Sequence, residues 1–184
     1  MPVQTPICDF GKKALPFELK STDNKVISLN DIKGENGTLI MFICNHCPYV
    51  KAVTKEIVED CNELKKIGIN SVAICANDAE NYPEDSFENM IKFSKDNNFN
   101  FPYLNDETQN IAKAYDAVCT PDFFGYNKNL ELQYRGRLRE LKNLIPVKEG
   151  ESDLLKAMKQ IADTSQGPKD QIPSAGCSIK WKTN

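Results

Sequence analysis

The chain has 184 residues, of which 40% are hydrophobic and 27% charged, and its formal net charge is -3. A chain of this length and composition can bury the core of one globular domain, so we expect residues 1–184 to form a single domain. The negative net charge argues against a nucleic-acid partner, because such proteins present a basic surface. No apolar run approaches the roughly 20 residues that span a bilayer, so we expect no membrane partner.

The N-terminal sequence and the cysteine count indicate a reducing compartment. The segment MPVQTPICDF lacks the charged stretch and the apolar stretch that begin a secretory signal. The number of cysteines is odd, which argues against a framework of disulfides; they stand at positions 8, 44, 47, 61, 75, 119 and 177. We therefore expect a cytoplasmic protein, in which an exposed cysteine pair needs a catalytic or a metal-binding explanation.

The first third of the chain contains two strand patterns and a helix pattern. Residues 16–29 alternate weakly around a polar turn and predict a β-hairpin. The continuous apolar run 38–44 predicts a strand that is covered on both faces. From Pro48 onward, apolar residues recur every three or four positions, which predicts a helix that ends near Gly68.

The same alternation continues toward the C-terminus. Residues 69–76 predict a second central strand, and Asp85 or Ser86 is expected to cap the next helix. The later elements predicted are a short strand at 101–104, a helix at 107–117 capped by Asp106, a hairpin of 122–126 and 130–136, and a helix at 152–163. The remainder, 165–184, is rich in Pro, Gly and polar residues and predicts an irregular tail. The whole pattern predicts an α/β sandwich with a mixed sheet.

Cys44 and Cys47 stand where the apolar run 38–44 gives way to the helix that begins at Pro48. A helix N-terminus offers free N–H groups and a partial positive charge, which stabilise a thiolate, the nucleophilic form of cysteine. We expect Cys44 to be the attacking thiolate and Cys47, one turn further on, to resolve a mixed disulfide. His46, the only histidine, is expected to lower the pKa of Cys44 further when it is protonated.

A cysteine pair can also bind metal. A structural zinc site usually needs four ligands, often from a second CxxC or from paired histidines. Here the other cysteines are scattered singly and the only histidine lies inside the pair. We therefore predict no resident metal and no cofactor, and keep copper(I) on the two thiolates as an alternative.

A second motif, VCTPDFF, places Thr120 and Pro121 just before an apolar strand, an unusual position for a trans proline. With this motif, residues 15–164 resemble the thioredoxin superfamily, in which a strand–CxxC–helix unit faces a cis-proline loop. LPFELKSTDNKVISLNDIKG and YLNDETQNIAKAYDAVCTPDFF are similar to the redoxin branch, close to the AhpC/TSA antioxidant proteins. The motifs CNHCPYVK, TPDFF, YRGR and GCSIKW together resemble peroxiredoxin-like proteins of the thioredoxin fold.

This resemblance implies a fold and a set of roles. The fold would be a thioredoxin-like sandwich, a mixed β-sheet flanked by helices, with an N-terminal β-hairpin. Cys44 matches the attacking cysteine, Cys47 the resolving cysteine and Pro121 the cis-proline. Thr120 and Pro121 would present their backbone to an incoming substrate chain as a short β-type pairing.

Peroxide reduction is an alternative function. Peroxiredoxins carry Pro and Thr or Ser ahead of their reactive cysteine, in a PxxxTxxC pattern, whereas this chain has Gly37 and Met41 there. Their active-site arginine aligns with Pro121. The sequence therefore predicts a thiol–disulfide oxidoreductase that acts on protein or small-molecule disulfides and thiols and is served by a thiol reductant, with an antioxidant peroxidase as the alternative.

The remaining cysteines and arginines receive simpler interpretations. Cys61 and Cys75 follow apolar patterns and are expected in the core. Cys119, next to Thr120, and Cys177, in the tail, are possible auxiliary thiols. The arginines at 135, 137 and 139 are expected to form a solvated edge.

Overall fold

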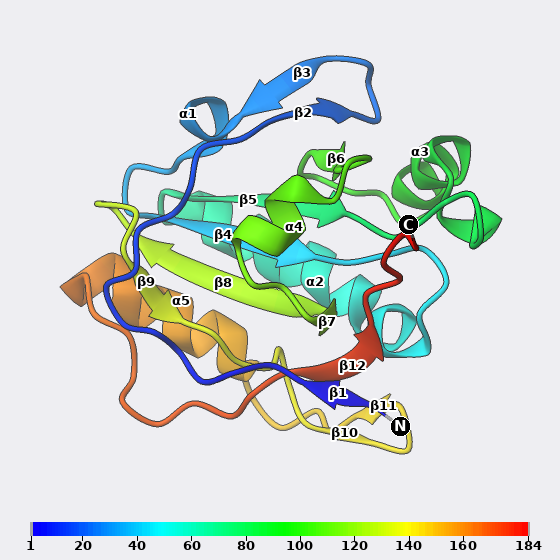
Figure 1. Ribbon diagram of the computed structural model, residues 1–184. Coiled ribbons are helices and arrows are strands. Elements are labelled where there is room, and N and C mark those ends of the chain that lie inside the picture. The colour runs from blue at the N-terminus through cyan, green and yellow to red at the C-terminus, as the bar shows by residue number, and fades with distance from the viewer. Residues whose placement is uncertain (1, 184) are drawn as a thin grey trace.

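The computed structural model describes residues 2–183. Within them, one seven-stranded sheet has the order β3-β2-β6-β5-β4-β8-β9 (Figure 1), with bounds β2 (Glu18–Ser21), β3 (Val26–Ser28), β4 (Gly37–Phe42), β5 (Ile69–Cys75), β6 (Tyr103–Asn105), β8 (Asp122–Asn127) and β9 (Leu132–Tyr134). Strand β4 is parallel to β5 and antiparallel to β8, so the sheet is mixed. The predicted α/β sandwich and its N-terminal hairpin, β2–β3, are confirmed.

Helices cover both faces of this sheet: α1 (Leu29–Ile32), α2 (Pro48–Lys66), the 3-10 helix η1 (Pro83–Asp85), α3 (Phe87–Asp96), α4 (Asn110–Ala114) and α5 (Asp153–Thr164). Side chains of β4 alternate between the faces. Leu39 and Met41 pack with residues of α2, α3 and α5, whereas Ile40 and Phe42 pack with residues of α1 and α4. None of the helices within residues 2–183 is both long and apolar enough to cross a membrane.

Helix α2 carries the dithiol motif at its N-terminus. One face of the helix is apolar and buried from Val50 to Leu64, which fixes the helix against the sheet. Pro48 occupies its first position, where the N–H that proline lacks would be unpaired in any case. The helix ends just before Gly68, whose φ of 81° lies in the left-handed region that glycine adopts without strain. The predicted start and end of this helix are therefore confirmed.

The C-terminal tail is more ordered than its composition predicts. The tail contains the middle strand, β12 (Ala175–Ser178), of a second sheet in the order β1-β12-β7, with β1 (Val3–Gln4) and β7 (Cys119–Thr120). The expectation of an irregular tail at 165–184 is wrong for these residues. Both partners of β12 are two-residue segments far away in the sequence, so no local alternation of apolar and polar residues predicts the strand. A separate small hairpin joins β10 (Leu141–Lys142) and β11 (Ile145–Pro146).

The arginine stretch is also different from its prediction. Arg135 and Arg139 are buried, 6% and 8% exposed, and only Arg137 is half-buried. Arg135 pairs with Asp122 at 2.8 Å, and Arg139 pairs with Glu56 at 2.7 Å. A buried guanidinium requires a paired anion. The expected solvated edge is wrong because these anions come from other elements, which the spacing of the arginines does not reveal.

Candidate active site

Cys44 and Cys47 lie in the short connection between β4 and α2. Cys44 follows the strand by two residues, and Cys47 is the N-cap residue of the helix. Both side chains are buried, with Cys44 1% and Cys47 0% exposed. The dithiol is therefore covered by other parts of the chain.

The proline loop is one of the parts that cover it. The Thr120–Pro121 peptide bond is cis, as the resemblance implies. The Sγ of Cys44 lies 3.4 Å from the Thr120 hydroxyl, and the thiol of Cys47 donates to the Thr120 carbonyl at 3.3 Å. The fold thus brings together four residues that the sequence assigned to one site, although 73 and 76 positions separate Thr120 from the two cysteines.

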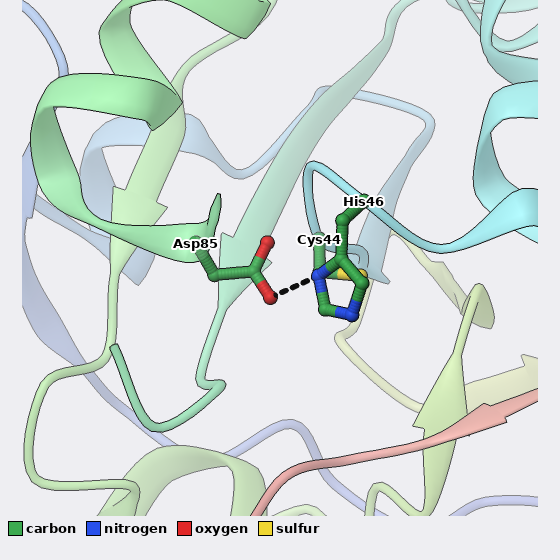
Figure 2. A group of neighbouring side chains, drawn as sticks. All are labelled: Cys44, His46 and Asp85. Atoms are coloured by element: carbon green, nitrogen blue, oxygen red, sulfur yellow. Dashed lines mark ion pairs between the residues drawn. The ribbon is translucent and has the colours of Figure 1, made fainter. Parts of the chain in front are cut away.

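His46 turns toward a carboxylate that the sequence did not single out for this site. Its Nδ1 lies 2.6 Å from Oδ2 of Asp85, with the sulfur of Cys44 close to the ring (Figure 2). The carboxylate lies off the line of the ring N–H, so the contact is an ion pair by distance and not a well-aligned hydrogen bond. The positive charge expected beside Cys44 is therefore accompanied by a negative charge.

Asp85 is held by several donors. Its Oδ1 accepts the Asn45 N–H at 2.7 Å, and its Oδ2 accepts the Asn77 side-chain amide at 2.8 Å. The side-chain oxygen of Asn45 accepts in turn from the buried Tyr103 hydroxyl at 2.8 Å. Ser86, not Asp85, caps α3. The sequence signal for Asp85, a carboxylate next to a serine, was interpreted as a helix cap, and its role beside His46 was missed.

Cys177 completes a group of three thiols. In the β7–β12 ladder Cys177 is opposite Thr120, and its Sγ lies 2.8 Å from the Sγ of Cys47. This separation is short for a non-bonded contact, and a disulfide bond measures about 2.05 Å. Gly176 permits the close approach, because a Cβ built there would lie 1.9 Å from the Thr120 carbonyl oxygen. The structure thus brings the predicted auxiliary thiol into contact with the CxxC pair.

The hydrogen bonds of the pair favour a thiolate on Cys47. A hydrogen bond from Cys44 is the largest influence that lowers the pKa of Cys47 to about 5, and further bonds from Cys177 and the Val50 N–H also lower it, against burial. The pKa of Cys44 is raised, first by this shared hydrogen bond, then by burial and the charge of Asp85. The shared hydrogen bond stabilises one thiolate within the pair, and the assignment of the attacking thiolate to Cys44 stays a prediction.

The other predicted thiols form no hydrogen bond with these three sulfurs in the described part of the chain. Cys119 is 0% exposed, its Sγ lies 3.7 Å from the Pro121 carbonyl oxygen, and burial raises its pKa. Cys61 and Cys75 are in the apolar core, as predicted. An auxiliary role for Cys119 stays a prediction.

One group of side chains in the described part of the chain has spacing suitable for a metal. The ligand atoms of Cys44, His46 and Asp85 lie within 4.8 Å of one another (Figure 2). This set offers one sulfur, whereas copper(I) prefers several soft ligands. Both oxygens of Asp85 already accept hydrogen bonds from amide groups. The absence of a resident metal stays a prediction.

Comparisons with known proteins place this chain in a family. The sequence profile of the AhpC/TSA family matches residues 10–140. An uncharacterized conserved protein from Geobacillus kaustophilus is 43% identical over 100% of this chain and 98% of its own, with a TM-score of 0.91. A hypothetical protein from Sinorhizobium meliloti is 31% identical over 100% of both chains, also with a TM-score of 0.91.

A more distant structure shows the fold alone. The thioredoxin domain of a thiol-disulfide oxidoreductase from Bacteroides vulgatus is 16% identical over 68% of this chain and 86% of its own, with a TM-score of 0.58. None of the curated proteins compared with the chain matches it. The family profile covers most of the chain and ends beyond the cis-proline loop. The chain therefore belongs to the AhpC/TSA family and is a thioredoxin-fold redoxin.

Proposed function

We propose that this redoxin is a thiol–disulfide oxidoreductase that cycles Cys44 and Cys47 between dithiol and disulfide. Its substrates would be disulfides and thiols of proteins or small molecules, and a thiol reductant would restore the dithiol. The cycle would operate in a reducing compartment such as the cytoplasm. The coarser assignment, to a family of oxidoreductases, rests on the match to residues 10–140.

One observation carries the proposal: both sulfurs of the pair contact Thr120, at 3.4 and 3.3 Å, at the N-terminus of α2. A dithiol used only for packing would not need a polar neighbour for each sulfur. The Thr120 hydroxyl can donate to Cys44 when that residue leaves a disulfide as thiolate. When Cys47 leaves a disulfide as a thiolate, the hydrogen bonds from Cys177 and from the Val50 N–H remain to stabilise it.

Peroxide reduction receives less support from the surroundings of Cys44. Met41 is buried in the core, at the position where the PxxxTxxC pattern has a hydroxyl. The guanidinium of Arg135 donates hydrogen bonds to the Asp122 carboxylate and to the Asp116 carbonyl, so it is already engaged by other groups. Without an activating hydroxyl at Met41, we expect hydrogen peroxide to oxidise the pair slowly.

The test is turnover of a disulfide substrate by the reduced protein. Oxidised glutathione and a disulfide-bonded peptide would be reduced by the wild type, Cys47→Ser would abolish turnover and Cys44→Ser would lower it. Cys61→Ala, on the same helix but in the core, is the matched control and should retain it. Undiminished turnover in both Cys44→Ser and Cys47→Ser would contradict the proposal. A kcat/KM for hydrogen peroxide above roughly 10⁴ M⁻¹s⁻¹ would favour the peroxidase.

A further inference from the structure

We propose that Cys177 is a third redox-active cysteine, which takes over the disulfide of the Cys44–Cys47 pair by bonding to Cys47 and exchanges it with thiols outside the protein. This inference rests on the proposed function and adds a route by which electrons pass between the cysteine pair and thiols outside the protein. In this route strand β12 contributes a reacting residue to the site.

The positions of the three sulfurs carry the proposal. Cys47 lies between the other two thiols: it contacts Cys177 at 2.8 Å and shares a hydrogen bond with Cys44. A thiol that attacks a disulfide must reach one of its two sulfur atoms. Cys177 already lies against the sulfur of Cys47, so exchange requires little movement of the chain.

The exposure of the three sulfurs explains why a third thiol is needed. Cys44 and Cys47 are 1% and 0% exposed, whereas Cys177 is half-buried. The β7 edge, which the sequence predicted would receive an incoming chain, is already paired with β12, with Cys177 opposite Thr120. A thiol from outside can therefore reach Cys177 while the CxxC pair stays covered.

The strand β12 is anchored firmly on both sides of Cys177. Before it, the Ser174 hydroxyl donates to the Pro121 carbonyl at 2.7 Å, and β1 pairs with Ala175 and Gly176. After it, Ile179 is buried. The Lys180 carbonyl accepts from the Asp78 N–H at 2.8 Å and from the Gln109 side chain at 2.9 Å. These contacts favour exchange through Cys177 over exposure of the pair by release of the strand.

The first step is an internal thiol–disulfide exchange. The thiolate of Cys177 attacks the Sγ of Cys47, the Cys44–Cys47 bond breaks, and the Cys47–Cys177 bond forms. Cys44 leaves as a thiolate beside the Thr120 hydroxyl and takes up a proton, while the proton of Cys177 passes to solvent. No electrons are gained or lost in this step.

The second step exchanges electrons with a thiol reductant. One reductant thiolate attacks the Sγ of Cys177, and Cys47 leaves as a thiolate. A second reductant thiol attacks the mixed disulfide, which releases Cys177 and a reductant disulfide. Two electrons have then passed to the protein, and the reverse sequence reduces a disulfide substrate.

The charges around Cys177 agree with this order of events. Its pKa is raised to about 11, first by burial and then by the hydrogen bond and the charge of Cys47. When Cys47 is part of a disulfide, its charge and that hydrogen bond are gone. The ammonium of Lys180 and the Tyr49 N–H, which lower the pKa of Cys177, then remain. Cys177 becomes a better nucleophile when the pair is oxidised.

The first measurement maps the disulfides. The reduced full-length protein is oxidised with diamide, quenched with acid, alkylated and digested, and its disulfides are identified by mass spectrometry. We expect both Cys44–Cys47 and Cys47–Cys177 in the wild type, and Cys47–Cys177 in most molecules of Cys44→Ser. The absence of Cys47–Cys177 from both proteins would overturn the proposal.

The second measurement is the rate at which reduced glutathione reduces the oxidised protein. In Cys177→Ser, which keeps the Cys44–Cys47 disulfide, we expect the rate to fall at least about tenfold. Cys61→Ala removes a thiol that is buried in the core on the helix that follows Cys47, and it should leave the rate unchanged. An unchanged or faster rate in Cys177→Ser would overturn the route while leaving the proposed function intact. A wild type that forms no Cys44–Cys47 disulfide and has no disulfide turnover would instead contradict the proposed function.

Discussion

At the scale of single residues, the charge next to Cys44 is that of Asp85. Its carboxylate raises the pKa of Cys44, and it is ion-paired with His46 at 2.6 Å. A negative charge close to a thiol disfavours the thiolate. The redox chemistry of the pair is therefore expected to depend on a side chain 41 positions beyond Cys44.

Asp85→Asn should lower the pKa of Cys44 and raise the reduction potential of the pair. Removal of this negative charge stabilises the thiolate that the hydrogen-bonded pair shares, and a more stable reduced form makes the disulfide more oxidising. We expect a rise on the order of 10–30 mV, since 30 mV corresponds to about 1.4 kcal/mol for this couple. The potential is measured by equilibration with glutathione buffers, and the pKa by the pH dependence of alkylation.

Glu84→Gln is the matched control, because it removes the same charge from an exposed side chain one residue away. A shift of equal size in Glu84→Gln would show that the general charge of the segment, not the position of Asp85, matters. A fall in potential in Asp85→Asn would contradict the prediction directly.

The residues of the dithiol motif could be predicted from the sequence, but their electrostatics could not. A cysteine pair between an apolar run and a helix pattern carries its own signal, as does Thr120–Pro121 before a strand. The Asp85 contact joins segments 40 positions apart through the Asn45 N–H, so only the fold reveals it. The helix N-terminus that the sequence predicted beside the pair is present, with Cys47 as its N-cap residue.

At the scale of elements, α2 and α5 meet at a buried carboxylate. The Ser152 hydroxyl, which also caps α5, donates to Asp60 of α2 at 2.6 Å. Burial is the main cause that raises the pKa of Asp60 to about 6. The Glu56–Arg139 ion pair lies near this junction, and its two charges also act on Asp60.

The raised pKa makes this junction sensitive to pH. Between about pH 4 and pH 6 the folded protein holds a proton on Asp60 that the unfolded chain has lost, so stability falls as the pH rises through this window. Asp60→Asn removes this dependence. We expect the variant to gain about 2 kcal/mol relative to wild type between pH 4 and pH 7, from about 1.4 kcal/mol per pKa unit.

Urea unfolding at several pH values measures this difference. Glu59→Gln changes an exposed carboxylate at the adjacent position and serves as the control, with a much smaller pH-dependent difference expected because its charge is the least of the causes that raise the pKa of Asp60. A difference between Asp60→Asn and wild type that stays constant from pH 4 to pH 7 would contradict the prediction.

Long elements with strong periodicity were predictable, and short elements held by distant partners were not. The buried run of β4 and the apolar face of α2 are local patterns, so their positions follow from the sequence. Strand β12 pairs with β1 and β7, which are only two residues long. Its stability comes from this non-local pairing, and the polar and glycine-rich composition of the tail conceals it.

At the scale of the whole molecule, a Cys47–Cys177 disulfide would join positions 130 residues apart. Closing a long loop restricts the unfolded chain far more than the two-residue spacing of the CxxC pair does. Oxidised Cys44→Ser should therefore unfold at a higher temperature than its reduced form. We expect a gain of about 2–4 kcal/mol, which corresponds to roughly 5–15 °C in Tm for a chain of this size.

Calorimetry of the oxidised and reduced forms of this variant checks the effect of the long loop. The double variant Cys44→Ser with Cys177→Ser lacks that disulfide and should show no change in Tm on oxidation. Equal Tm values for oxidised and reduced Cys44→Ser, with the disulfide confirmed by mass, would contradict the entropic argument.

The pairing of β12 with β7 has a consequence for the order in which the protein is made. Cys44 and Cys47 leave the ribosome 130 residues or more before Cys177, a delay of roughly 7–26 s at 5–20 residues per second. During this interval the two cysteines can react with each other and with thiols around the nascent chain, but not with the third. The covered site described here is therefore completed only after β12 has been made, and until then the newborn dithiol lacks the cover that this strand gives it.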